Sequence, residues 1–198
     1  MIFLSQSLPT STTQIKRLLF AAFLAATTTA LPATECANES KAFGIVAIHS
    51  GSNVQYSSFK AAKGSIFAGL KNQGARCARP KEQDATFYIK NGALYLYDTS
   101  ATPQEIFVDR SGMGQGVIGY DTLAQGTPKN GERKGWAIKD GHLQFAGNHL
   151  IACPHSIDGA WSIWVSIGDP NPGDNKNCVG ITAHIKEISN PNACHYTE

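Results

Sequence analysis

The 198-residue sequence lacks the patterns that mark most enzymes and metal proteins. It has no H-E-x-x-H motif, no G-x-S-x-G nucleophile elbow and no two cysteines at C-x2-C spacing. Residues 111–116 (SGMGQG) lack the G-x-G-x-x-G spacing of a phosphate cradle, which favours a β-turn or bulge. Residues 169–180 lack the Gly and Glu positions of an EF-hand calcium loop. We therefore predict no catalytic residue, cofactor or metal site.

Charge is also scarce, because Asp, Glu, Lys and Arg make up only 16% of the residues. The whole chain has 17 basic and 15 acidic residues, and two of the basic ones, Lys16 and Arg17, lie in a predicted signal peptide. Without that segment the two signs balance and no basic block remains. The sequence therefore gives no electrostatic reason to expect nucleic acid or acidic membrane surfaces as partners.

Only one long apolar run is present, at residues 18–26 (LLFAAFLAA). It follows Lys16 and Arg17 and precedes small residues that continue to Ala33, which is the pattern of a secretory signal. The run is shorter than the ~20 residues that span a bilayer, and the polar C-terminus does not resemble a GPI-anchor signal. We predict a signal peptide at residues 1–33, cleaved after residues 30–33, and one exported, soluble domain at residues 34–198. Asn38 heads the only N-x-[ST] sequon and is the predicted glycosylation site.

Five cysteines follow the predicted signal, and an exported protein is expected to pair most of them. Cys153 and Cys178 lie on two candidate strands separated by a polar loop, which favours a disulfide between them. Cys36 and Cys194 lie near the two ends of the exported chain, and domain termini often lie close together. This pairing would leave Cys77 as a free thiol or bonded to another chain. Spacing alone does not choose among the possible arrangements.

Short alternating segments separated by turn residues dominate the rest of the chain. Residues 85–90 and 93–97 flank Asn91–Gly92, the dipeptide preferred in type I′ hairpins. Asp140–Gly141 predicts a second hairpin of the same kind. Further candidate strands are residues 43–49, 104–109, 117–120, 136–139, 142–145, 150–153, 161–167 and 178–188. Residues 58–70 are the only candidate for a helical turn, although two internal glycines weaken it. We predict an all-β, compact, disulfide-tied antiparallel sandwich or barrel.

An internal repeat favours a β-trefoil as the alternative fold. The segments FYIKNGALYLY and WAIKDGHLQFA share an aromatic residue, an Ile-Lys pair, an Asn-Gly or Asp-Gly turn and a leucine. FGIVAIHSG is a weaker third copy. The spacings between the three copies are unequal, which favours the sandwich or barrel.

Two groups of side chains are candidates for function. Asp98, Asp109 and Asp121 are candidate carboxylates for glycoside hydrolysis, which requires two carboxyl groups ~5–10 Å apart. Aromatic residues offer a possible sugar-stacking surface, although core packing is the expected role for most of them. These are Tyr88, Tyr95, Tyr97, Trp136, Trp161 and Trp164. Trp161 and Trp164 fall on opposite faces of a strand, so at most one faces the core.

Several ordered phrases resemble the PhiA family of filamentous fungi. They are FGIVAIHSGSNVQY, SIFAGL, ATFYIKNGALYLY, SATPQEIFVDRSGMGQG, HLQFAGNHLIACP, AWSIWV and NPNACHYT. The resemblance implies a secreted cell wall protein with a structural role in forming phialides and conidia, and some members of the family are IgE-binding allergens. It supplies no catalytic residues, so a non-enzyme with wall polysaccharide or matrix partners is expected. A lectin-like glycan-binding module and a secreted wall hydrolase are the two alternatives.

Overall fold

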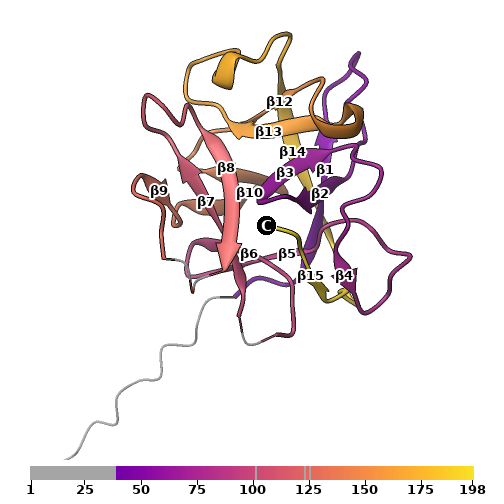
Figure 1. Ribbon diagram of the computed structural model, residues 1–198. Coiled ribbons are helices and arrows are strands. Elements are labelled where there is room, and N and C mark those ends of the chain that lie inside the picture. Colours follow the sequence, from indigo (N-terminus) through magenta and orange to yellow (C-terminus); the bar gives the residue numbers. More distant parts are fainter. Residues whose placement is uncertain (1–38, 101, 123, 125) are drawn as a thin grey trace, which may run out of the picture. The chain divides into compact units, whose positions relative to one another are not determined.

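A computed structural model describes residues 39–100, 102–122, 124 and 126–198. β-Strands and short 3-10 turns are the regular elements of this part of the chain, which confirms the predicted all-β class (Figure 1). The strands are β1 (Phe43–Ile48), β2 (Phe59–Ala62), β3 (Ser65–Ala68), β4 (Arg76–Cys77), β5 (Phe87–Lys90), β6 (Ala93–Leu96), β7 (Gln104–Asp109), β8 (Val117–Thr122), β9 (Gly131–Glu132), β10 (Trp136–Lys139), β11 (His142–Phe145), β12 (Leu150–Cys153), β13 (Trp161–Val165), β14 (Val179–Glu187) and β15 (Cys194–His195). The 3-10 turns are η2 (Ile157–Gly159) and η3 (Pro172–Asp174).

Six strands close into an antiparallel barrel. β1 pairs with β5, β5 with β6, β10 with β11, β11 with β14, and β14 with β1. The remaining link joins β6 to β10, where the amides of Gly135 and Trp136 each donate to the Gly92 carbonyl at 3.0 Å. An antiparallel bridge between Ala93 and Lys134 adds to this link. Closing the ring gives each of these strands a partner on both sides, so no barrel edge is left open to another chain.

Three hairpins, β2–β3, β7–β8 and β12–β13, pair with one another. β3 pairs with β8, β8 with β13, and β13 with β3. The chain therefore repeats a barrel strand, a hairpin and a second barrel strand three times, over residues 43–90, 93–139 and 142–187. This pairing pattern is that of a β-trefoil, the alternative that the internal repeat indicated.

The unequal spacing of the repeated phrases now has a structural reason. FYIKNGALYLY and WAIKDGHLQFA span the junctions between successive units, as the hairpins β5–β6 and β10–β11. The segment FGIVAIHSG instead lies at β1, which opens the first unit. Its partner across the third junction is β14, at the other end of the domain.

The core lies where apolar side chains of all three units meet. In β1 the side chains alternate between buried and half-buried, as expected for a strand with one face on the core. Trp136 is only 3% exposed, and its ring packs edge-on against Phe145 with centroids 5.0 Å apart. A small internal cavity is lined by Ile45, Phe59, Ile66, Phe87, Leu94, Ile106, Ile118, Trp136, Leu143 and Leu150. Since each unit supplies only part of this core, the three units depend on one another for burial.

The predicted turns behave as their sequence indicated, with one exception. Asn91 and Gly92 both have positive φ (52° and 78°), as a type I′ hairpin requires. The helical turn expected within residues 58–70 is wrong, because this segment forms the β2–β3 hairpin. Lys63 and Gly64 adopt positive φ and reverse the chain, while Phe59 and Ile66 point into the core. Burial of most side chains in both strands outweighs the weak local preference for helix.

The structure contains two disulfides among its described cysteines. One joins Cys153 to Cys178, the pair that the strand positions indicated. The other joins Cys77 to Cys194, so the expected pairing of Cys36 with Cys194 is wrong and Cys77 is not a free thiol. The reason is that β4 and β15 form a two-stranded sheet in which Cys77 and Cys194 are direct partners, with Cα atoms 4.0 Å apart (Figure 1). Cys36 lies outside the described residues.

Candidate binding surface

The candidate catalytic carboxylates are separated. Asp109 and Asp121 lie at opposite ends of the β7–β8 hairpin, opposite Val117 and Glu105. Four residues along a strand correspond to about 13 Å, which exceeds the separation used in glycoside hydrolysis. Asp109 accepts a hydrogen bond from the Ser111 amide at 2.8 Å and thereby shapes its own turn.

Asp98 has local structural partners of its own. It accepts hydrogen bonds from the Ser100 amide at 3.1 Å and the Ser100 hydroxyl at 2.9 Å, and it lies 3.3 Å from His195 Nδ1. Burial alone would raise the pKa of Asp98, but the hydrogen bonds from Ser100, His195 and Thr99 outweigh it and lower the pKa. The carboxylate therefore stays ionised and fastens β15 to the segment before β7.

Asp121 belongs to a buried charge cluster with Arg133 and Glu105 that sequence reasoning missed. Arg133 Nη2 lies 2.6 Å from Asp121 Oδ1, and Arg133 Nε lies 3.9 Å from Glu105 Oε2. Arg133 also donates to the Glu105 carbonyl at 3.0 Å. Burial raises the pKa of Glu105 despite the opposing charge of Arg133. The cluster holds the chain before β10 against β7 and β8. The one signal in the sequence was Glu105, an acidic residue near the start of the candidate strand at residues 104–109, whose neighbours are apolar or buried.

Three of the candidate aromatic residues form a tyrosine cluster, which consists of Tyr88, Tyr95 and Tyr97. Tyr88 and Tyr95 are direct partners across β5 and β6, and their rings stack with centroids 5.1 Å apart. Tyr97 meets Tyr88 edge-on at 6.4 Å. All three are half-buried, so part of each ring remains open to solvent. The pKa of Tyr95 is raised to about 12, mainly by burial and secondly by the negative charge of Glu105, so the Tyr95 hydroxyl stays neutral.

The tryptophans have other roles. Trp136 is a core residue. Trp161 is half-buried and packs against the core. Trp164 is also half-buried, donates from Nε1 to the Ser162 hydroxyl at 3.0 Å and lies so close to Gly173 that a Cβ there would come within 2.5 Å of its ring. Trp136 is therefore excluded from the predicted aromatic surface, and among the six candidates the three tyrosines are the ones whose rings contact one another.

Residues 187–192 contribute to the lining of two surface hollows, one of which includes Tyr97. The tyrosine hollow, of about 540 Å³, is lined by Lys41, Ala42, Tyr97, Glu187, Ile188, Ser189 and Pro191. The lysine hollow, of about 550 Å³, is lined by Lys60, Lys71, Lys81, Glu82, Gln83, Asp84, Thr86, Ile188, Asn190 and Asn192. Tyr97 connects the tyrosine cluster to the first hollow, and Ile188 contributes to both. The two hollows together therefore present an aromatic ring, side-chain amides and charged groups.

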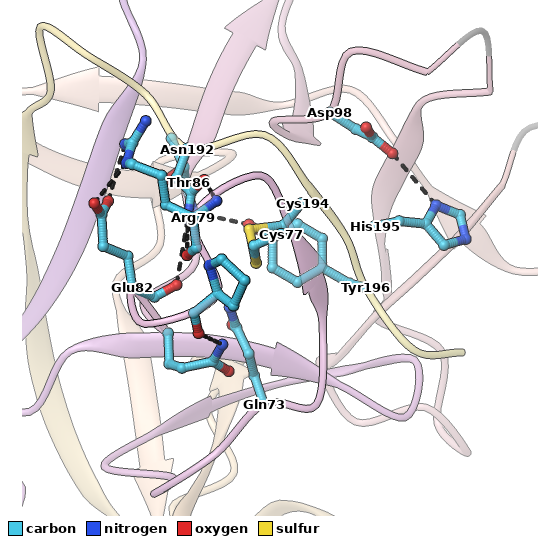
Figure 2. The surroundings of a disulfide bond; sticks show 12 residues. Gln73, Cys77, Arg79, Glu82, Thr86, Asp98, Asn192, Cys194, His195 and Tyr196 are labelled. Carbon is cyan, nitrogen blue, oxygen red and sulfur yellow. Dashed lines mark hydrogen bonds and ion pairs between the residues drawn. A yellow bond between two sulfur atoms is a disulfide. The ribbon is translucent and has the colours of Figure 1, made fainter.

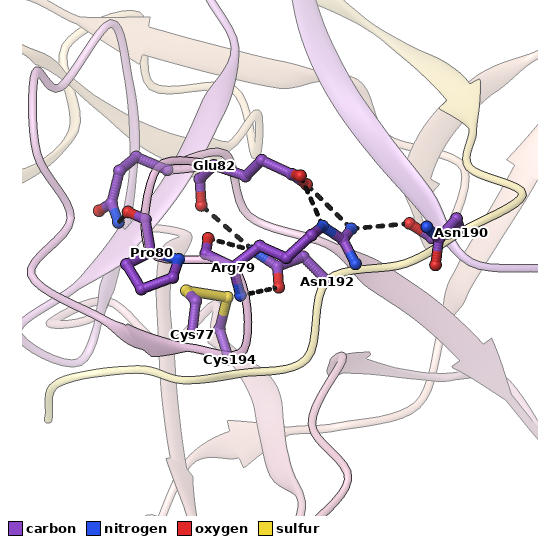
Figure 3. Close-up of polar contacts among 8 residues, drawn as sticks. Cys77, Arg79, Pro80, Glu82, Asn190, Asn192 and Cys194 are labelled. Atoms are coloured by element: carbon purple, nitrogen blue, oxygen red, sulfur yellow. Dashed lines mark hydrogen bonds and ion pairs between the residues drawn. A yellow bond between two sulfur atoms is a disulfide. The ribbon is translucent and has the colours of Figure 1, made fainter.

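The segment of residues 187–192 is fastened by a polar clamp around Arg79 and is followed by the Cys77–Cys194 disulfide. The Arg79 guanidinium donates to both Glu82 carboxylate oxygens, at 2.5 and 2.9 Å, and to the Asn190 carbonyl at 2.9 Å (Figure 3). The Asn192 side chain accepts from the Arg79 amide at 2.9 Å and donates to the Arg79 carbonyl at 3.0 Å. Backbone on both sides of the lysine hollow is therefore fastened by a covalent bond and charge-assisted hydrogen bonds.

Figure 2 shows the Arg79–Glu82 pair on one side of the disulfide and the Asp98–His195 pair on the other. Beside them, the Tyr196 hydroxyl accepts from the Thr86 amide at 3.1 Å, and burial raises the pKa of Tyr196 to about 12. The C-terminal segment is thus anchored to the chain that precedes β5.

These features define a class: a disulfide-tied β domain with a rigid, polar and aromatic surface. No helix within the described residues is long and apolar enough to cross a membrane. A family model described as PhiA-like secreted protein matches residues 43–197. The chain belongs to the PhiA family, and it is a secreted protein of the fungal cell wall.

Curated relatives cover between 70% and 93% of the chain. The cell wall protein phiA of Aspergillus niger is 60% identical over 185 residues, which cover 93% of this chain and 98% of that protein. The protein of the same name from Aspergillus fumigatus is 62% identical over 186 residues, covering 93% and 100%. The one from Arthroderma benhamiae is 44% identical over 147 residues, covering 70% and 78%. No solved structure matches the chain.

Proposed function

We propose that the protein is a non-catalytic structural component of the wall that acts in forming phialides and conidia. We further propose that it is retained there by binding wall polysaccharide on the tyrosine cluster and the hollow beside it. The observation that carries the binding proposal is the stacked pair Tyr88–Tyr95, which continues through Tyr97 into a hollow lined by Lys41 and Glu187. The family resemblance supports the developmental role.

The chemistry of this surface suits a neutral sugar chain. Partly exposed tyrosine rings offer apolar faces to the C–H faces of a pyranose and hydroxyl groups at their edges. Lys41 and Glu187, which are paired at 3.1 Å and largely exposed, offer a donor and an acceptor for sugar hydroxyls. The contact area is small, so each site is expected to bind weakly. A wall polysaccharide repeats the same sugar face many times, so one polymer would offer many equivalent sites.

Replacing Tyr97 by alanine is expected to lower the affinity for insoluble chitin or β-glucan about 3- to 10-fold, the loss typical of one aromatic contact. The backbone bonds of Tyr97 to Thr86 and Cys194 remain, so the fold should survive. The measurement is a depletion isotherm with the purified protein. Tyr56→Asn is the matched control, because Tyr56 is 74% exposed and lies on the β1–β2 loop away from the cluster. Equal retention of the Tyr97 and Tyr56 variants would reject this surface.

The developmental proposal is tested by complementing a deletion strain with the parent protein and with three aspartate variants. The deletion should change phialide or conidium formation without a metabolic block. Asp98→Asn, Asp109→Asn and Asp121→Asn should complement in every case where the variant folds and is secreted. Loss of complementation by one such variant would instead favour the hydrolase.

Processing of the N-terminus is predicted from the sequence alone. Residues 1–38 lie outside the described residues. Cleavage should fall between Ala30 and Ala33, and the secreted protein should lose mass on treatment with an N-glycosidase, through removal of a glycan from Asn38. Edman or mass-spectrometric sequencing gives the new terminus. A secreted chain that starts at Met1 would contradict the signal peptide, and an unchanged mass would contradict the glycan.

A further inference from the structure

Two histidines that no sequence motif singles out face each other on the barrel. His142 opens β11 and His184 lies within β14, and the two are direct partners across this strand pair. Their ring centroids are 5.6 Å apart and the ring planes are inclined by 56°. His184 is exposed and His142 is half-buried, so solvent reaches the pair. The strands are joined at this point by a hydrogen bond from the Ile185 amide to the Gly141 carbonyl at 2.9 Å.

The separation of the rings matches that of two imidazoles sharing one metal ion. Zinc–nitrogen bonds of about 2.0–2.1 Å place a ring centroid about 3.2 Å from the ion. Two such rings at a near-tetrahedral angle then have centroids about 5 to 5.5 Å apart. We propose that His142 and His184 form a two-ligand site for a divalent transition metal ion, with water in the remaining coordination positions.

The surroundings select the kind of metal. No third His, Cys, Asp or Glu joins the pair to make a group of three in the part of the chain that the structure describes. Lys139 is the strand partner of His142, Val46 is the strand partner of His184, and Lys186 follows two residues later. Ca²⁺ and Mg²⁺ require oxygen ligands, which an imidazole pair does not offer. Imidazole pairs favour Cu²⁺, Ni²⁺ and Zn²⁺, and Cu²⁺ should bind most tightly.

Binding at this site would depend on the folded barrel. The two histidines are 42 residues apart in the sequence and meet only when β11 and β14 pair, so the native state binds the ion better than the unfolded chain does. The ion should therefore raise the midpoint of thermal unfolding by mass action. Because β11 opens the third unit and β14 ends it, the bridge would tie the two ends of that unit together.

The test is titration of the purified, secreted protein with CuCl₂, followed by calorimetry and electron paramagnetic resonance. We expect one Cu²⁺ ion bound through two imidazole nitrogens, an increase in the unfolding midpoint, and at least a 10-fold loss of affinity in both His142→Ala and His184→Ala. His155→Ala, which removes an exposed histidine outside these strands, should bind as the parent does. His184→Gln provides a second variant with a polar side chain of similar length, should the alanine form fold poorly.

Three outcomes would overturn the proposal. The first is that the parent protein binds no Cu²⁺. The second is that either single variant at residue 142 or 184 binds as tightly as the parent. The third is that His155→Ala loses affinity to the same extent. These results are independent of polysaccharide binding, which the Tyr97 variant tests separately.

Discussion

Replacing both Cys77 and Cys194 by alanine is expected to destabilise the folded protein by about 5 kcal/mol. The bond closes a loop with a sequence separation of 117 residues, and the chain-entropy relation converts that length to roughly this free energy. Such a loss is comparable to the whole stability of many domains, so the variant should be largely unfolded at 37 °C. The measurement is urea unfolding of the purified variant followed by circular dichroism.

The second disulfide supplies the control. Cys153 and Cys178 are 25 residues apart, so the same relation gives about 3.5 kcal/mol for Cys153→Ala/Cys178→Ala. The two double variants should therefore differ by more than 1 kcal/mol, with the Cys77/Cys194 variant the less stable. The opposite order would show that local packing around β12, and not loop length, dominates the stability contributed by these bonds.

Replacing Arg133 by methionine is expected to destabilise the protein by about 3–5 kcal/mol at pH 7, because it leaves Asp121 and Glu105 buried without a cation. The matched control is Arg110→Met. Arg110 also pairs with a carboxylate, Glu132 at 2.6 Å, and also lies over a phenylalanine ring, but its ion pair is much more exposed. A pair at the surface contributes about 1 kcal/mol or less. Equal losses in the two variants would contradict the role of burial.

The pH dependence of the Arg133 variant has a definite sign. The pKa of Glu105 is already raised in the folded state, so its ionised form costs stability above that pKa and the cost disappears as the pH falls below the unfolded value of about 4.3. Arg133 opposes this shift, and its removal raises the pKa of Glu105 further. The difference in unfolding free energy between parent and variant should therefore shrink from pH 7 to pH 5. A constant difference would mean that the loss comes from packing.

Local patterns predicted much of the secondary structure. The Asn91–Gly92 and Asp140–Gly141 turns, and the alternating strands beside them, depend on contacts within about ten residues, which the sequence displays directly. The β2–β3 hairpin was missed because its turn, Lys63–Gly64, carries no strong local signal. Its strand character comes from packing Phe59 and Ile66 into a core shared with the other two units.

The candidate surface was predicted only as a set of residue types. Tyr88 and Tyr95 stack because the Asn91–Gly92 turn sets the strand register, and that pairing could be inferred from the hairpin. The hollows depend on residues 187–192, which line them together with side chains from residues 41–97, much earlier in the sequence. No local pattern indicates that approach. The buried Arg133 cluster is a similar case, since Glu105, Asp121 and Arg133 come from three separate segments.

The sequence by itself determined the all-β class and the resemblance to a family of secreted wall proteins, because turn residues, alternation and ordered phrases are local properties of the chain. The tertiary structure alone decided that Cys194 bonds to Cys77, that Tyr97 lines a hollow with Lys41 and Glu187, and that His142 faces His184. The physical reason is the three-unit closure of the barrel. It brings together strands that are far apart in sequence, and the pairing register across these long loops sets which side chains meet.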